Sequence, residues 1–217
     1  MRLYHFLSER DALDDLTRQR LKLSEIENLN DPFELWCSDQ RDRRMRFALQ
    51  NWKREMSKRY GLVCFSAAWQ NPLLWSHYAD RHRGICLGFD VPDNAATPVK
   101  YIDARTPLRL PLTDAAMRTI LFTKFVGWSY EEEWRAWFRL EERDPNAKDL
   151  YFREFDAELS LREVIVGPLC VCSRSVIDAI ERYGGSVRGI KAQLAFESFH
   201  VVEDNRGLIV QNSRKAR

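Results

Sequence analysis

The segment formed by residues 61–91 constrains the fold most, because it combines two short apolar runs with a helix signal between them. The apolar runs, residues 62–66 and 85–89, are nearly uninterrupted, as is typical of strands that are covered on both faces. Between them, Asn71 is a natural N-cap and Pro72 suits the first helical position. The segment therefore predicts two core strands that flank one helix.

That predicted helix is rich in aromatic and imidazole side chains, and we expect it to end at Gly84 with a positive φ. Trp75, Tyr78 and His82 fall on one arc of the helix, so they form either a core face or the wall of a pocket. His77 and His82 are five positions apart, about 140° around the axis, so they do not hold one metal together. We predict no metal site.

The rest of the chain mixes short strands and helices without a strict βα repeat. This pattern predicts an α+β fold, with mixed or antiparallel sheets and flanking helices. The expected strands are residues 3–7, 21–24, 99–102, 134–140, 151–155, 164–166 and 190–202, and the expected helices are residues 8–18, 40–59, 113–125 and 173–183. No repeat or change of composition divides the chain. We expect a single domain over residues 1–217, with a core over about 1–205 and a basic tail at 212–217.

Charge and cysteine content narrow the class of protein. The 217 residues include 34 basic and 32 acidic side chains, a balance that does not favour nucleic acid or membrane as a partner. Five cysteines without a signal-peptide pattern predict a reducing, cytoplasmic environment. No apolar run approaches the roughly 20 residues that a membrane-spanning helix requires, so we expect no membrane partner. The basic helix 41–59 is either a solvated face or a rim for a phosphate-bearing partner.

The acidic run at residues 131–133 is the most suggestive candidate for chemistry. Glu133 opens an alternating strand and shares its polar face with Arg135. Such a carboxylate can accept a sugar hydroxyl, or stabilise the positive charge that develops when a bond at an anomeric carbon breaks. The alternative is a solvent-exposed Glu–Arg pair that contributes little to stability.

Several motifs together resemble domain-of-unknown-function family 2971, a bacterial family. They are Leu3-Tyr4-His5-Phe6, Asn30-Asp31-Pro32-Phe33-Glu34, Cys64-Phe65-Ser66, Trp75-Ser76-His77-Tyr78-Ala79 with Gly84, and the stretch from Lys124 to Arg135. The motifs extend over residues 3–140, and residues 163–167 are similar more loosely. This resemblance implies kinship and carries no established activity.

The order of these motifs is also similar to that of ADP-ribosyltransferase-like domains, which bind NAD. The shared order is an early strand with a Tyr-His pair, a middle strand followed by an aromatic helix, and a late strand opened by a glutamate. The resemblance implies that His5 holds the nicotinamide-side ribose and that Ser66 or Tyr78 supports or stacks the nicotinamide. It also implies that Glu133 bonds a ribose 2′-hydroxyl and stabilises an oxocarbenium-like transition state.

We therefore predict a polar pocket for a nucleotide-like ligand, with NAD as the candidate substrate and no cofactor assigned. The predicted catalytic residues are Glu133, His5 and Tyr78, and the predicted ligand-binding residues are Asn30, Asp31, Glu34, Ser66, Trp75 and Arg135. The resemblance implies a toxin or phage-defence effector. Two alternatives stay open. One is a non-catalytic module that binds nucleic acid or protein through the basic helix 41–59, and the other is that the motifs are only structural.

Overall fold

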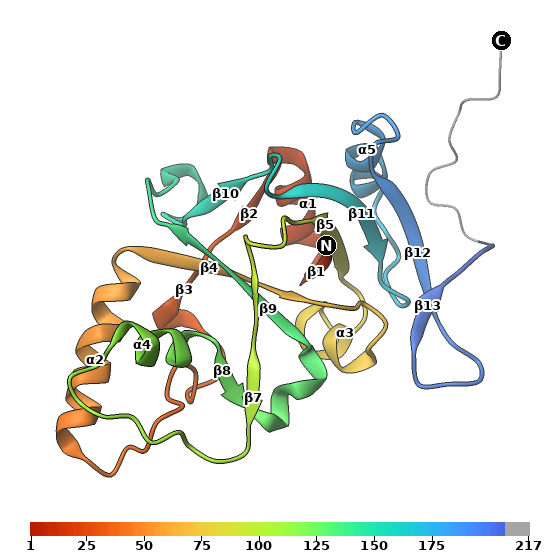
Figure 1. Cartoon of the computed structure of the whole chain (residues 1–217). Helices are drawn as coiled ribbons and strands as arrows, with labels where there is room; N and C mark the ends of the chain where they lie inside the picture. Colours follow the sequence, from red (N-terminus) through yellow and green to blue (C-terminus); the bar gives the residue numbers. More distant parts are fainter. Residues whose placement is uncertain (207–217) are drawn as a thin grey trace. The chain divides into compact units, whose positions relative to one another are not determined.

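The computed structural model describes residues 1–206, which form two compact units (Figure 1). The first unit comprises Met1–Leu21, Phe65–Asp93 and the described residues from Glu154 onward, and the second comprises Lys22–Cys64 and Asn94–Arg153. Helices and a mixed sheet are both present, which confirms the predicted α+β class. The predicted basic tail, 212–217, lies outside the described residues. The single domain and the likeness to ADP-ribosyltransferases stay predictions.

The first unit is built on a sheet with strand order β13-β12-β11-β5-β1. Its strands are β1 (Arg2–Leu7), β5 (Ile85–Asp90), β11 (Ser160–Val166), β12 (Arg188–Leu194) and β13 (Val201–Glu203). Strand β5 pairs antiparallel with both β1 and β11, whereas β11 and β12 run parallel. Strand β5 lies inside the sheet and residues 85–89 are all buried, so both faces of this strand are covered. This burial explains the uninterrupted apolar run in the sequence.

Three helices belong to the first unit: α1 (Glu9–Arg18), α3 (Pro72–Tyr78) and α5 (Arg174–Glu181). Helix α1 packs against α5, and α3 packs against β1. The Ser8 side chain accepts a hydrogen bond from the backbone N–H of Asp11, and Asn71 accepts one from Leu73. Both N-caps were predicted and both are confirmed, because a cap depends only on residues that are close in sequence.

The end of α3 differs from the prediction. The helix stops at Tyr78, and residues 80–82 turn the chain with positive φ angles of 42°, 53° and 70°. His82 therefore lies outside the helix. Gly84 does not have the positive φ that we expected. A Cβ atom on Gly84 would instead lie 2.0 Å from the backbone oxygen of Leu7, so glycine is required there by the close approach of β1.

The second unit contains short strands with two helices. They are β3 (Ser24–Glu25), residues 60–64 of β4 (Tyr60–Ser66), β6 (Thr97–Pro98), β7 (Lys100–Ile102), β8 (Thr123–Phe125), β9 (Glu133–Arg139), α2 (Arg43–Ser57), α4 (Asp114–Leu121), and the 3₁₀ turns η1 (Ile26–Asn28), η2 (Val126–Glu131) and η3 (Pro145–Ala147). Strand β9 lies between β4 and β6, and β7 pairs with β8 in parallel. Three of the four unit boundaries fall within strands, namely β2 (Arg20–Lys22), β4 and β10 (Phe152–Glu154), and the fourth lies between Asp93 and Asn94.

The core of the second unit forms beneath the apolar stripe of α2. Met45 and Leu49 are buried, and Trp52 and Met56 continue the stripe with partial burial. This helical spacing was predicted from the sequence and is confirmed. Other buried members of the core are Ile26, Leu35, Cys37, Leu62 and Ile120.

Helix α4 is shorter than predicted. It begins after the N-cap Thr113, as expected, but ends at Leu121, and Thr123–Phe125 forms strand β8. Thr123, Lys124 and Phe125, which were read as a last helical turn, instead pair with β7. Tertiary pairing has overridden the local pattern here.

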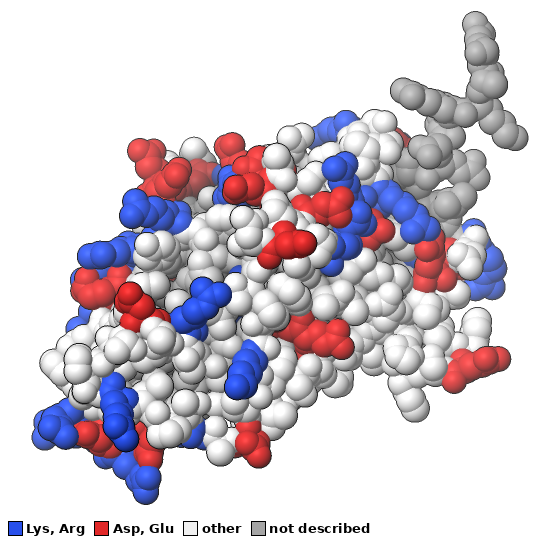
Figure 2. Space-filling view, viewed as in Figure 1, with Lys and Arg blue, Asp and Glu red and all other residues white. Residues whose placement is uncertain are grey.

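The predicted basic helix is present as α2, but acidic residues accompany it. Arg41 pairs with Asp39, and Arg44 pairs with Asp42, the N-cap of the helix. Figure 2 shows red and blue side chains together at the lower left, where α2 begins. Binding of nucleic acid through residues 41–59 stays a prediction. In residues 1–206, no helix combines the length and the apolar character needed to cross a membrane.

Candidate functional site

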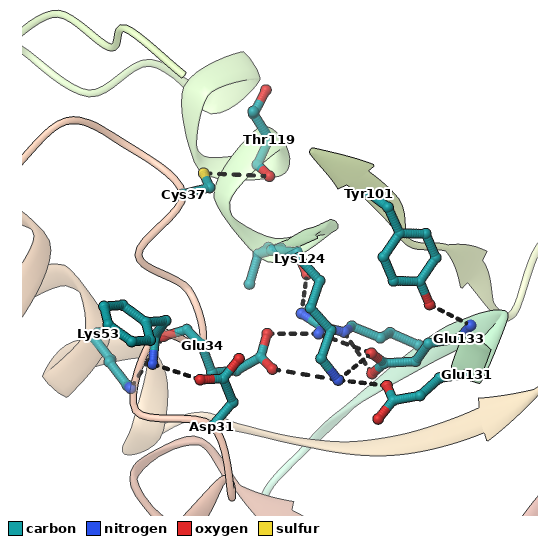
Figure 3. Close-up of polar contacts among 12 residues, drawn as sticks. Asp31, Glu34, Cys37, Lys53, Tyr101, Thr119, Lys124, Glu131 and Glu133 are labelled. Carbon is teal, nitrogen blue, oxygen red and sulfur yellow. Dashed lines mark hydrogen bonds and ion pairs between the residues drawn. The ribbon is translucent and has the colours of Figure 1, made fainter. Parts of the chain in front are cut away.

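A buried network of charged side chains lies in the second unit (Figure 3). Its members are Glu34 in the turn after Pro32, Lys124 on β8, Glu131 at the end of η2, and Glu133 and Arg135 on β9. Each of the five side chains belongs to a residue that is between 1% and 7% exposed. Burial of charge is costly unless every group is paired, so the geometry of this network determines what it contributes.

Arg135 is bonded through all three of its guanidinium nitrogens. Nε donates to Oε1 of Glu133 at 2.8 Å, and Nη2 donates to Oε1 of Glu34 at 2.6 Å and to Oε2 of Glu133 at 3.1 Å. Nη1 donates to the backbone oxygen of Leu121 at 2.7 Å. The planar guanidinium therefore joins the turn, the end of α4 and strand β9.

Lys124 lies among three carboxylates. Its Nζ is 2.6 Å from Oε2 of Glu131, 3.0 Å from Oε2 of Glu133 and 3.7 Å from Oε2 of Glu34. The same ammonium lies 5.1 Å from the centroid of the Trp128 ring. Three carboxylates thus face two cations, and the formal charge of the network is −1 when all five groups are ionised.

These contacts keep Glu133 and Lys124 charged at neutral pH. Burial alone would raise the pKa of Glu133, but Arg135 and Lys124 outweigh it and lower this pKa to about 2. Burial lowers the pKa of Lys124, but the neighbouring carboxylates, with Glu133 the strongest, raise it above its ordinary value. A permanently protonated Lys124 serves as a charge and a donor, not as a nucleophile.

A cavity of about 350 Å³ adjoins the network at Lys124. Its lining residues come from three segments: Asp31, Phe33, Trp36 and Cys37; Ile102, Asp103, Ala104 and Arg105; and Thr123, Lys124, Phe125 and Trp128. Four of these side chains are aromatic. One pocket is therefore lined by the end of β7 and the residues after it, by β8 and η2, and by the turn at 31–37, and Lys124 joins this pocket to the charged network.

The structure brings several predicted site residues of the second unit together. Glu34, Glu133 and Arg135 are bonded to one another, and Asp31 lines the adjoining pocket. Asn30 is exposed and precedes the turn. The solvent-exposed alternative for the Glu133–Arg135 pair is wrong, since these residues are 3% and 1% exposed. Glu133 and Arg135 on β9 point into the unit, because Glu34 and Lys124 form ion pairs with them there.

The remaining predicted site residues belong to the first unit. They are His5 on β1, Ser66 at the end of β4, and Trp75 and Tyr78 on α3. Trp75 is completely buried, and its Nε1 donates to the backbone oxygen of Trp69 at 2.6 Å. Ser66 Oγ donates to the backbone oxygen of Ala68 at 2.8 Å. These contacts give Trp75 and Ser66 structural roles, and the joint use of this set with Glu133 in one site stays a prediction.

Sequence reasoning did not assign roles to Lys124, Glu131 or Trp128. A lysine inside the short strand Thr123–Phe125 looks like a solvated charge when the strand is mistaken for the end of a helix. The i, i+2 rule for an extended chain could not have paired Glu131 with Glu133, because Glu131 ends η2 and Glu132 has a left-handed backbone with φ of 45°. The two carboxylates meet at Lys124 through this turn.

Comparison with known proteins found no matching family model, no matching curated protein and no matching solved structure. The resemblances to family 2971 and to ADP-ribosyltransferase-like domains therefore stay predictions. Within residues 1–206, no group of three or more histidine, cysteine or acidic side chains is arranged to hold a metal ion.

Proposed function

We propose that the second unit binds a nucleotide-like small molecule in the pocket beside Lys124. The observation that carries this proposal is the lining, in which Phe33, Trp36, Phe125 and Trp128 surround a cavity of about 350 Å³. This volume lies within the range of about 300–1,000 Å³ typical of ligand sites. Flat rings stack on aromatic side chains, and nucleobases and nicotinamide offer such rings.

Charged groups at the pocket supply the polar part of the recognition. Arg105 is exposed at the rim, with its guanidinium 5.6 Å from the centre of the Phe33 ring and one nitrogen bonded to the backbone oxygen of Ser38. A guanidinium held in this way donates well to phosphate or ribose oxygens. A ligand with a ring inside and an anionic group at the rim would use both features.

NAD is the first ligand to test, because the resemblance to ADP-ribosyltransferase-like domains implies it. Glu133 is bonded to Lys124 but is not among the residues that line the pocket. In this proposal Glu133 holds Lys124 in position, and cleavage of NAD requires the ligand to reach the buried carboxylate. A toxin or phage-defence role would follow only if the protein consumes NAD.

The direct test is calorimetric titration of the protein with NAD, ADP-ribose and AMP, together with an assay for released nicotinamide. Ala104→Trp would fill the cavity from an exposed lining position, and Ala115→Trp, at an exposed position on α4, is the matched control. We expect binding to wild type and to Ala115→Trp, with strong loss in Ala104→Trp. Absence of binding for all three ligands, or unchanged binding to Ala104→Trp, contradicts the proposal.

A further inference from the structure

Asp31 is a buried carboxylate on the pocket wall that no cation neutralises at close range. It is 6% exposed and lines the cavity, and its Oδ1 accepts one hydrogen bond, from the backbone N–H of Phe33 at 2.8 Å. Across residues 1–206 it forms no ion pair, and Lys53 acts on it only through a longer-range attraction. A buried negative charge with so little compensation favours a positive partner.

Among the described residues, neither cation of the pocket lining forms an ion pair with Asp31. Lys124 is surrounded by the carboxylates of the network, which carries a formal charge of −1 as a whole. Arg105 lies at the exposed rim, and the exposed Asp103 accompanies it there. Asp31 and Lys124 are the buried charged residues of the lining, and of these two only Asp31 lacks an ion pair among the described residues.

The aromatic lining of the pocket also favours a positively charged ligand. The faces of Phe and Trp rings carry partial negative charge, and they attract cations that lie over them. The ammonium of Lys124, 5.1 Å from the centroid of Trp128, is one such contact within the protein. Arg105 lies over Phe33 in the same way, so Trp36 and Phe125 are the rings left to a cationic ligand. A ligand ring that is itself positive would gain from these ring faces and from Asp31.

We propose that the pocket selects ligands whose aromatic ring carries a positive charge, such as an N-alkylated pyridinium, and that Asp31 determines this specificity. The inference rests on the proposed function, since it concerns the same pocket. It predicts discrimination between ligands that differ in ring charge and in little else.

Two matched ligand pairs test the charge preference on the wild-type protein. Nicotinamide mononucleotide is compared with its reduced form, and 1-methylnicotinamide with nicotinamide. We expect the cationic member of each pair to bind roughly tenfold more tightly or better. Equal affinity within both pairs overturns this inference and leaves the proposed function standing. If no nucleotide binds at all, both fail.

The role of Asp31 is tested with Asp31→Asn, whose amide oxygen can still accept from the Phe33 N–H. The control is Asp103→Asn, at the exposed rim of the same pocket. We expect Asp31→Asn to lose most of the discrimination while binding of the neutral ligands changes little, and Asp103→Asn to retain it. Full discrimination in a folded Asp31→Asn protein overturns the role of Asp31. Asp31→Ser, whose hydroxyl can also accept that bond, replaces Asp31→Asn if the latter does not fold.

Discussion

Glu34 and Arg135 are 101 residues apart in the sequence, yet Oε1 of the one lies 2.6 Å from Nη2 of the other inside the second unit. Both residues are almost fully buried, at 4% and 1% exposure. The pair fastens the turn that carries Asp31 and Phe33 to strand β9. The pocket wall and the charged network are therefore physically linked. A substitution in the network should also affect the pocket wall, and a substitution in the wall should affect the network.

Loss of Arg135 should destabilise the protein strongly. Arg135→Met removes the charge shared by Glu34 and Glu133 and leaves their carboxylates buried without this partner, so we expect a loss of about 3–5 kcal/mol in the free energy of unfolding. Arg139→Met, at the exposed end of the same strand, is the control and should change it by less than about 0.5 kcal/mol. Urea denaturation measures both, and equal midpoints would contradict a structural role for Arg135.

Glu133→Gln should have a smaller effect than Arg135→Met. Glutamine keeps one acceptor oxygen, but its NH2 group then faces the donors of Arg135 or Lys124 where the other carboxylate oxygen stood. The two remaining carboxylates still face two cations. We expect a loss of about 1–3 kcal/mol. Glu132→Gln, at the exposed neighbouring position, is the matched control. Thermal melting compares the two variants. A Glu133→Gln protein as stable as wild type would speak against the structural reading of this carboxylate and return it to the list of candidate catalytic groups.

The network should also make stability depend on acidity. The pKa of Glu133 is about 2 in the folded protein, against an ordinary value of 4.5. Glu133 therefore stabilises the folded state above pH 4.5, and this contribution is lost as the pH falls from about 4.5 to about 2. The full contribution is on the order of 3 kcal/mol. Unfolding free energies at pH 6, 4 and 3 should fall more steeply for wild type than for Glu133→Gln. Parallel curves would show that this carboxyl titrates normally in the folded protein.

Removal of the exposed aromatic wall should weaken binding without affecting the fold. Phe33 is 63% exposed and Phe47, on α2, is 66% exposed, so alanine at either position should leave the melting temperature nearly unchanged. Only Phe33 lines the pocket. Loss of its stacking should weaken the binding of a nucleotide-like ligand about three- to tenfold, as measured by calorimetry. A similar loss in Phe47→Ala would show that the effect does not arise at the pocket.

Gly84→Ala should test the core of the first unit. The new Cβ would lie 2.0 Å from the Leu7 backbone oxygen and under 3 Å from the backbone of Ala79, so β1 or the end of α3 must shift. We expect a loss of at least about 3 kcal/mol. Gly184→Ala, where φ is +60° and the space is open, should cost only about 1 kcal/mol. Chemical denaturation ranks the two variants, and the reverse order would contradict the close approach at Gly84.

Local features were predictable because their causes are local. The N-caps Ser8 and Asn71 depend on residues within one turn, and the apolar stripe of α2 and the apolar run of β5 can each be read from one continuous stretch of sequence. Predictions failed where distant pairing took over. The last residues of the expected helix 113–125 became β8 because β7 offered a parallel partner, and α3 ended early in a turn with positive φ angles.

The sequence by itself determined that Glu133 and Arg135 share one face of a strand, since side chains alternate with a period of two. It did not determine whether that face meets water or the interior. Only the tertiary structure decided this, by bringing Glu34, Lys124 and Glu131 to the same point. The physical reason is that two buried charges gain stability from partners that complete their hydrogen bonds, and those partners come from strands and turns that no local pattern connects.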